Sequence, residues 1–156
     1  MKKETDIRTF NHEDLVDLLS TAFYGSTLLA CDYSKETYKK AYYEDDECIE
    51  DIMAKLLLSG DKVFVGDMYA QDASDCNGSK LPHKYDAEQE IMWYDVTLED
   101  IRRGVQSCMD CVDANGNNDT FLHQCAVDFL NGKGDMDLIE AESIMQVILF
   151  GKLIYG

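Results

Sequence analysis

Long hydrophobic runs are missing from this chain of 156 residues. The longest strongly apolar run extends from Val147 to Phe150 and is followed closely by Lys152. A helix that crosses a bilayer needs roughly 20 apolar residues, so the sequence predicts no membrane span. The first residues, Met1 to Asp6, are polar and do not resemble a signal peptide, which favours a cytoplasmic protein.

Positive charge is also scarce. Fourteen Lys and Arg stand against 31 Asp and Glu, so the formal net charge is −17 at pH 7. An excess of this size creates a negative potential over most of the surface. The composition therefore argues against direct binding to nucleic acid or to an anionic membrane.

Proline is nearly absent, with one residue at Pro82, and no repeat, low-complexity tract or interdomain linker interrupts the chain. The rest of the composition is that of an ordinary globular protein, with 46% hydrophobic and 10% aromatic residues. A chain of this length can bury a core without disulfides or metals. We expect a single domain over residues 1–156.

Six cysteines form an even set, which in a small secreted protein would indicate disulfides. The N-terminal residues favour the reducing cytoplasm instead. Free thiols are therefore expected.

The spacing of apolar residues predicts an α+β fold that is mostly α, with about five to six helices. The last helix is apolar nearly all round from Ile144 to Phe150, so we expect it to be the central element. Two β-branched and aromatic segments are expected to form a small two-stranded antiparallel β-hairpin, joined by a long loop over 71–89. The expected helices cover 11–25, 34–43, 46–58, 97–112, 119–131 and 137–150, and the expected strands cover 62–69 and 91–96.

Several polar residues stand where they could cap these helices and accept hydrogen bonds from first-turn N–H groups. The expected caps are Asn11, Ser34, Thr97 with Asp100, Asp119, and Asp137 with Glu140.

One group of soft ligands could hold a tetrahedral zinc ion: Cys108, Cys111, His123 and Cys125. Their spacing is not that of a standard zinc motif. Cys108 and Cys125 also fall on apolar helix stripes, where a thiol packs as a small hydrophobe. A zinc-binding regulatory domain is therefore an alternative, and the leading prediction includes no cofactor.

The segment Asp113 to Asp119 carries oxygen side chains at alternate positions and resembles part of a calcium loop. With Asp113 as the first ligand, Asn118 stands where the loop wants glycine, and Gln124 stands where it wants a bidentate glutamate. A polar turn explains the segment with fewer assumptions. Calcium binding is a second form of the metal-binding alternative.

No nucleophile elbow, phosphate-binding glycine loop, metalloprotease helix or dinucleotide turn is present. We predict no catalytic residue. An enzyme with a site in the 71–89 loop is the remaining alternative.

The strongest feature is an acidic run, Glu44-Asp45-Asp46-Glu47, followed by Glu50 and Asp51. In a helix, six acids within these eight residues span roughly 12 Å, or about one charge per 2 Å. Duplex DNA carries about one negative charge per 1.7 Å, so a groove built for phosphates would meet a similar charge density. The nearby Tyr42 and Tyr43 could anchor the interface.

Further acids could extend this field if they share one face. They are Asp95, Glu99, Asp100, Asp110, Asp113, Asp119, Asp135, Asp137, Glu140 and Glu142. Acids near helix starts stabilise those helices. The remaining acids have no structural reason in the sequence. Each pair of like charges four residues apart destabilises a helix by a few tenths of a kcal/mol.

We therefore expect a small acidic protein that binds and inhibits a basic nucleic-acid-binding protein by presenting carboxylates where phosphates would lie. The expected partner-binding residues are Tyr42, Tyr43, Glu44, Asp45, Asp46, Glu47, Glu50 and Asp51. In size, acidity and lack of catalytic motifs, the chain is similar to the anti-restriction and anti-CRISPR inhibitors carried by phages and mobile elements.

Overall fold

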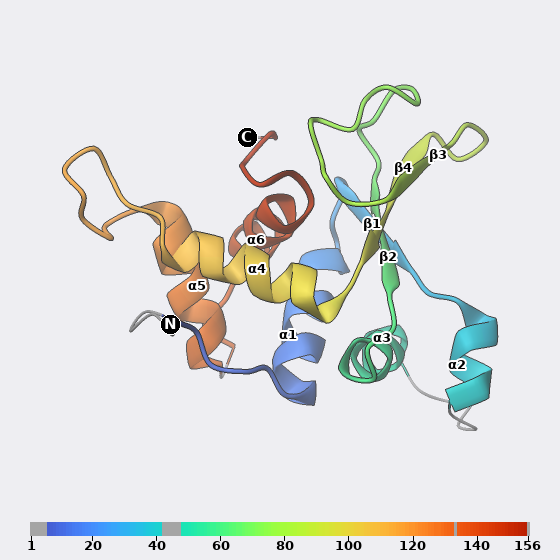
Figure 1. The fold of residues 1–156 in the computed structure, drawn as a ribbon, viewed down its shortest axis with the longest axis horizontal. Coiled ribbons are helices and arrows are strands. Elements are labelled where there is room, and N and C mark those ends of the chain that lie inside the picture. Colours follow the sequence, from blue (N-terminus) through green and yellow to red (C-terminus); the bar gives the residue numbers. More distant parts are fainter. Residues whose placement is uncertain (1–5, 42–47, 133, 156) are drawn as a thin grey trace.

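A computed structural model describes residues 6–41, 48–132 and 134–155 (Figure 1). In this part of the chain, six helices accompany a four-stranded sheet. The helices are α1 (His12–Phe23), α2 (Lys35–Ala41), α3 (Ile49–Leu58), α4 (Leu98–Met109), α5 (Phe121–Asn131) and α6 (Leu138–Phe150). The strands are β1 (Leu29–Asp32), β2 (Val63–Asp67), β3 (His83–Asp86) and β4 (Ile91–Val96).

The sheet is antiparallel with the strand order β1-β2-β4-β3. The predicted pairing of β2 with β4 is confirmed, but the two-stranded hairpin is wrong because β1 and β3 add an edge strand on either side. The sequence of β1, Leu-Ala-Cys-Asp, has no β-branched residue, and β3, His-Lys-Tyr-Asp, is polar. Short edge strands of this kind lack the alternation that identifies a half-buried strand.

The segment 71–89, predicted as one long loop, contains β3 and is therefore two shorter connections. The first joins β2 to β3, and the second is the tight turn between β3 and β4, in which Glu90 adopts a positive φ of 57°. Because β3 pairs with β4 in register, both ends of the turn are anchored in the sheet.

Capping boxes begin three of the helices, and their N-cap residues are the ones that the sequence predicts. Asn11, Thr97 and Asp137 each accept a hydrogen bond from the backbone N–H three residues on, and the acid at that position accepts one in return. The predicted cap of α5, Asp119, is wrong by one residue. Thr120 fills this position, and its Oγ1 accepts from His123 N–H at 3.1 Å.

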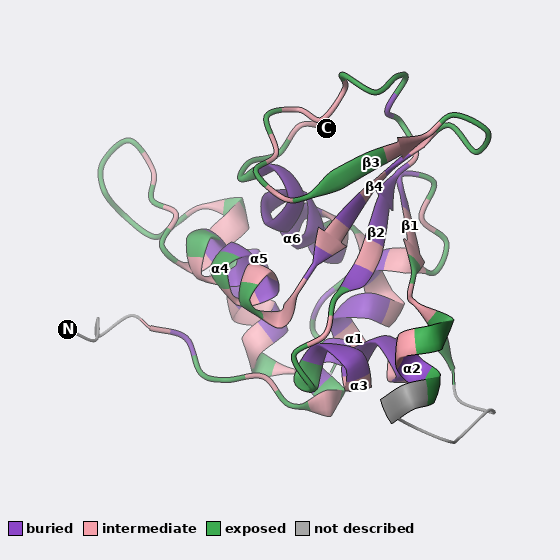
Figure 2. Cartoon of the chain, turned by 45° about the vertical axis from the view of Figure 1, so that its right-hand side comes forward, coloured by how far each residue is buried: buried purple, intermediate pink, exposed green. Residues whose placement is uncertain are grey.

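The core lies between the sheet and the helices, and α6 is its central element, as predicted. Helices α1, α4 and α5 surround α6 on one side of the sheet (Figure 1), and α6 is buried along nearly its whole length (Figure 2). Gly104 lets α4 approach α6 closely, because a Cβ at this position would lie 2.9 Å from Ile148 Cα. None of the helices in the described part is long and apolar enough to cross a membrane.

The two faces of the sheet differ sharply. Met92, Tyr94 and Val96 of β4 point inward and are buried, and the Tyr94 ring meets the Phe150 ring of α6 with centroids 5.7 Å apart. Alternate residues point outward, away from the helices that form the core. This outer face carries the candidate site.

Candidate functional site

The acidic run that dominates the sequence falls largely outside the described residues. Tyr42, Tyr43 and the run Glu44 to Glu47 belong to the segment 42–47, which the structure does not describe. Glu50 and Asp51 lie in the first turn of α3.

Both of these acids interact with α1 or its end. The Tyr24 hydroxyl lies 3.1 Å from each Glu50 carboxylate oxygen, and His12 Nε2 lies 2.9 Å from Asp51 Oδ1. Glu50 and Asp51 therefore have a structural role in joining α1 to α3. A partner would have to compete with these contacts.

The zinc alternative finds no support in the side-chain arrangement. Across 6–41, 48–132 and 134–155, no group of three or more His, Cys, Asp or Glu could hold a metal ion, and Cys111 is part of no such group. Cys108 and Cys125 are buried, and burial raises the pKa of each thiol to about 12, as expected for a cysteine that packs as a small hydrophobe. His123 Nδ1 lies 2.7 Å from the Met109 carbonyl oxygen, so this nitrogen is occupied as a donor.

The calcium alternative meets a similar obstacle in the loop between α4 and α5. Asp113 Oδ1 accepts from the backbone N–H groups of Asn115 and Asn117 at 2.8 and 3.0 Å. This carboxylate oxygen closes a polar turn, as the simpler interpretation predicts.

Acids expected to extend the negative field are spread over different structural positions. Asp100 and Asp137 serve as helix caps, and Glu140 is buried with 8% of its surface exposed. Burial raises the pKa of Glu140 to about 7, helped by a hydrogen bond to Asp128. Asp95, in contrast, lies on the open outer face of the sheet.

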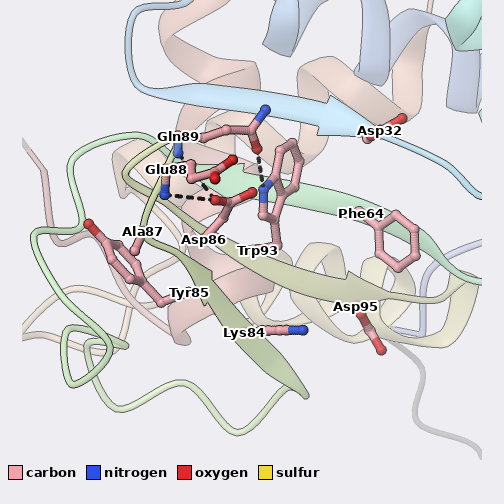
Figure 3. Close-up of a pocket in the computed structure, with 10 residues that line it drawn as sticks. All are labelled: Asp32, Phe64, Lys84, Tyr85, Asp86, Ala87, Glu88, Gln89, Trp93 and Asp95. Carbon is pink, nitrogen blue, oxygen red and sulfur yellow. Dashed lines mark hydrogen bonds between the residues drawn. The ribbon is translucent and has the colours of Figure 1, made fainter.

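That outer face forms a groove with a volume of about 610 Å³ (Figure 3). Side chains from all four strands and from the β3–β4 turn contribute to it. The lining residues are Asp32, Phe64, Lys84, Tyr85, Asp86, Ala87, Glu88, Gln89, Trp93 and Asp95.

The strand register arranges part of the groove as a row across three strands. Asp32 of β1 pairs with Phe64 of β2, and Phe64 pairs with Asp95 of β4. The row therefore presents an aromatic ring with a carboxylate on each side. The Lys62 side chain also contacts this row. Its Nζ lies 3.0 Å from Asp95 Oδ2 and 5.8 Å from the centre of the Phe64 ring.

A second row is built around Trp93. Trp93 pairs with Gly66 on one side and with Lys84 on the other. A Cβ at Gly66 would lie 3.0 Å from the indole, so glycine is what lets the Trp93 ring lie close to the sheet. Trp93 Nε1 donates to Gln89 Oε1 at 3.2 Å, which holds the ring from the side of the β3–β4 turn (Figure 3).

The charge of the groove is mainly negative. Among the described residues that line it, four carry a carboxylate and one, Lys84, is cationic. The acids are Asp32, Asp86, Glu88 and Asp95. An aromatic surface with an acidic rim is chemically complementary to arginine and lysine side chains.

Sequence reasoning missed Asp32, Phe64 and Trp93 as a group. A signal was present in β4: Met92, Tyr94 and Val96 form an apolar set, which leaves Trp93 and Asp95 for the opposite face. Their meeting with Phe64 depends on the strand register, which the sequence does not specify.

A buried polar cluster lies on the inner side of the sheet and is the nearest feature to the enzyme alternative. Asp67, with none of its surface exposed, accepts from the Tyr155 hydroxyl at 2.7 Å and from Tyr69 N–H at 2.8 Å. Burial raises the pKa of Asp67 and raises that of Tyr155 to about 12. Because Asp67 is sealed from solvent, the cluster fits a structural role of fixing the last residues against β2.

Comparison with known proteins finds no matching protein family, no similar curated protein and no similar solved structure. The site is therefore interpreted from its own geometry and chemistry.

Proposed function

We propose that this chain binds a basic nucleic-acid-handling protein through the outer face of its sheet and inhibits it by competing with the nucleic acid. The observation that carries the proposal is the row on the outer face in which Phe64 lies between Asp32 and Asp95. Such a row offers a cationic side chain both an aromatic face and carboxylates.

The combination of rings and acids supports competition with nucleic acid in particular. Proteins that bind single strands use a basic groove for the phosphates and stacking side chains for the bases. Carboxylates at Asp32 and Asp95 can take the place of phosphates, and the rings of Phe64 and Trp93 can take the place of bases. The groove thus offers both parts of what such a protein binds.

The net charge of −17 supports the same function at longer range. A strongly negative protein is steered toward a basic groove before contact, and like charge keeps nucleic acid away from its own surface. The predicted contribution of Tyr42, Tyr43 and the run Glu44 to Glu47 remains part of the proposal. In class, such a protein is similar to the anti-restriction and anti-CRISPR inhibitors.

Action in the reducing cytoplasm is also part of the proposal. All six cysteines are free thiols, and Cys48 is exposed. Exposed thiols persist where the environment is reducing.

The test uses two variants that lose the same amount of charge at different places. Asp32→Asn with Asp95→Asn neutralises the row, and Glu99→Gln with Asp119→Asn neutralises two exposed acids elsewhere. A third variant replaces the run from Glu44 to Glu47 with the matching amides. Each protein is immobilised and used to capture proteins from a host lysate at low salt and at about 0.5 M salt, where charges more than a few Å apart are screened.

We expect the wild type to capture a nucleic-acid-binding protein at low salt and to release it when a single-stranded oligonucleotide is added. The row variant should lose this capture, whereas the variant with changes at Glu99 and Asp119 should keep it. Equal capture by these two variants, or no release by the oligonucleotide, would contradict the proposal.

A further inference from the structure

We propose that the row of Asp32, Phe64 and Asp95 is a receiving site, that is, a binding site for an arginine side chain of a partner. Lys62 competes with that arginine for Asp95 and Phe64. The inference rests on the proposed function and names the chemistry that the partner must present.

The geometry of the row suits a flat cation. Neighbouring strands lie about 4.8 Å apart, so the backbones of Asp32 and Asp95 are separated by roughly 10 Å with Phe64 between them. A guanidinium that lies on the Phe64 ring has N–H groups on both of its edges. It can therefore donate toward a carboxylate on each side while its face contacts the ring.

Lys62 shows that a cation is already favoured at one half of this row. Its ammonium lies 3.0 Å from Asp95 Oδ2 and 5.8 Å from the Phe64 ring centre, which is within the range of a cation–π contact. Since 54% of the Lys62 side chain is exposed, the contact is open to solvent and a guest can displace it.

In the other half of the row, the Asp32 carboxylate is positioned to bind a cation. Asp32 is exposed, and its Oδ1 accepts from Tyr33 N–H at 2.8 Å, which orients the carboxylate. Within the described residues the other oxygen, Oδ2, has no hydrogen-bond partner, so it can accept from a guanidinium. An ammonium is a compact charge, whereas a guanidinium is an extended plane with donors on both edges, so the two-sided row favours arginine over lysine.

Lys62 and Lys84 provide a matched pair of variants. Both lie on the outer face, and Lys62→Gln and Lys84→Gln change the net charge by the same amount. Lys62→Gln frees Phe64 and Asp95, whereas Lys84→Gln changes the row of Trp93. If the row is the receiving site, Lys62→Gln should strengthen binding clearly more than Lys84→Gln.

The experiment titrates a fluorescently labelled glycine–serine peptide that carries arginine, and follows its anisotropy at low salt. Matched peptides carry lysine or the neutral arginine analogue citrulline. We expect the arginine peptide to bind about three- to tenfold more tightly than the lysine peptide, and the citrulline peptide not to bind. Lys62→Gln should tighten the arginine complex by a similar factor.

Two losses are expected in the same assay. Asp32→Asn and Phe64→Leu should each weaken binding of the arginine peptide several-fold, and circular dichroism checks that both variants are folded. Equal affinity for the arginine and lysine peptides would overturn the inference, as would equal effects of Lys62→Gln and Lys84→Gln. Neither result would contradict the proposed function, which requires a basic partner without choosing between the two cations.

The experiments can also show that the proposed function fails while the arginine site is supported. Selective binding of the arginine peptide, combined with lysate capture that is the same for the row variant and its control, would support the receiving site and contradict the proposed function.

Discussion

Many of the acidic residues have structural partners that the sequence does not reveal. Asp14 binds both terminal nitrogens of Arg8, at 2.6 and 3.0 Å, and also accepts from Asn11 N–H. Burial would raise the pKa of Asp14, but these hydrogen bonds outweigh it and hold the pKa below its usual range. Part of the surplus of acids is thus explained by structure, and Asp32 in the groove is an acid that stays exposed.

Glu140 gives a prediction about pH. Its pKa is about 7 in the folded protein, against an ordinary value of 4.5, so the folded state keeps the proton more firmly than the unfolded state does. Stability should therefore fall as pH rises from about 4.5 to about 7 and stay lower above that range. Glu140→Gln should remove this loss and raise the free energy of unfolding at about pH 8 by roughly 1–3 kcal/mol.

Urea unfolding of both proteins across this pH range checks the prediction. Glutamine can still accept from the Asp137 N–H, so the capping box survives the substitution. Glu99→Gln, at an exposed acid in the first turn of α4, serves as the control and should leave the pH profile unchanged. Parallel profiles for the wild type and Glu140→Gln would show the prediction to be wrong.

At the scale of elements, the last residues are fixed to α6 and β2 by specific hydrogen bonds. Gln146 Oε1 of α6 accepts from the N–H groups of Ile154 and Tyr155, both at 2.9 Å. The Tyr155 hydroxyl then donates to Asp67 of β2 at 2.7 Å. The segment after α6 therefore covers the buried end of β2.

Removing this last donor should destabilise the protein. Tyr155→Phe leaves the buried Asp67 carboxylate without its side-chain donor, which should cost about 1–3 kcal/mol in urea unfolding at neutral pH. Tyr85→Phe makes the same chemical change at an exposed hydroxyl that donates to the Gln71 carbonyl at 3.1 Å. Its cost should be below about 0.5 kcal/mol, and equal costs for the two variants would contradict the role of Tyr155.

Local signals explain which elements could be predicted from the sequence. Helices α1, α4 and α6 combine an apolar pattern with a capping box, and both signals lie within a few residues of each other. Strands β1 and β3 have no such signal, because what defines an edge strand is its pairing with a distant segment. Thr120 replaced Asp119 as a cap because both residues have capping side chains, and the choice depends on where α5 packs.

The same reasoning explains why the candidate site was missed. The predicted site followed charge density along the chain, which is visible in the run from Glu44 to Glu47. The observed row joins Asp32, Phe64 and Asp95 across three strands, and no window of the sequence contains them together. A site built on strand register requires the fold to be known first.

At the scale of the whole molecule, a net charge of −17 on 156 residues implies self-repulsion in the folded state. Salt screens this repulsion, so the melting temperature should rise by a few degrees between about 0.01 M and 0.3 M sodium chloride. Differential scanning calorimetry measures the rise. It should be smaller for Glu99→Gln with Asp119→Asn, which carries less negative charge, and a melting temperature that falls with salt would contradict the prediction.

Trp93 is the one tryptophan in the chain, and it lies in the groove with its ring against Gly66. The intrinsic tryptophan emission of the protein consequently originates from the face to which we assign binding. A guest that reaches this face should alter the colour or intensity of that emission without any attached dye. The native chain thus carries its own optical reporter, and partners can be screened with unmodified protein.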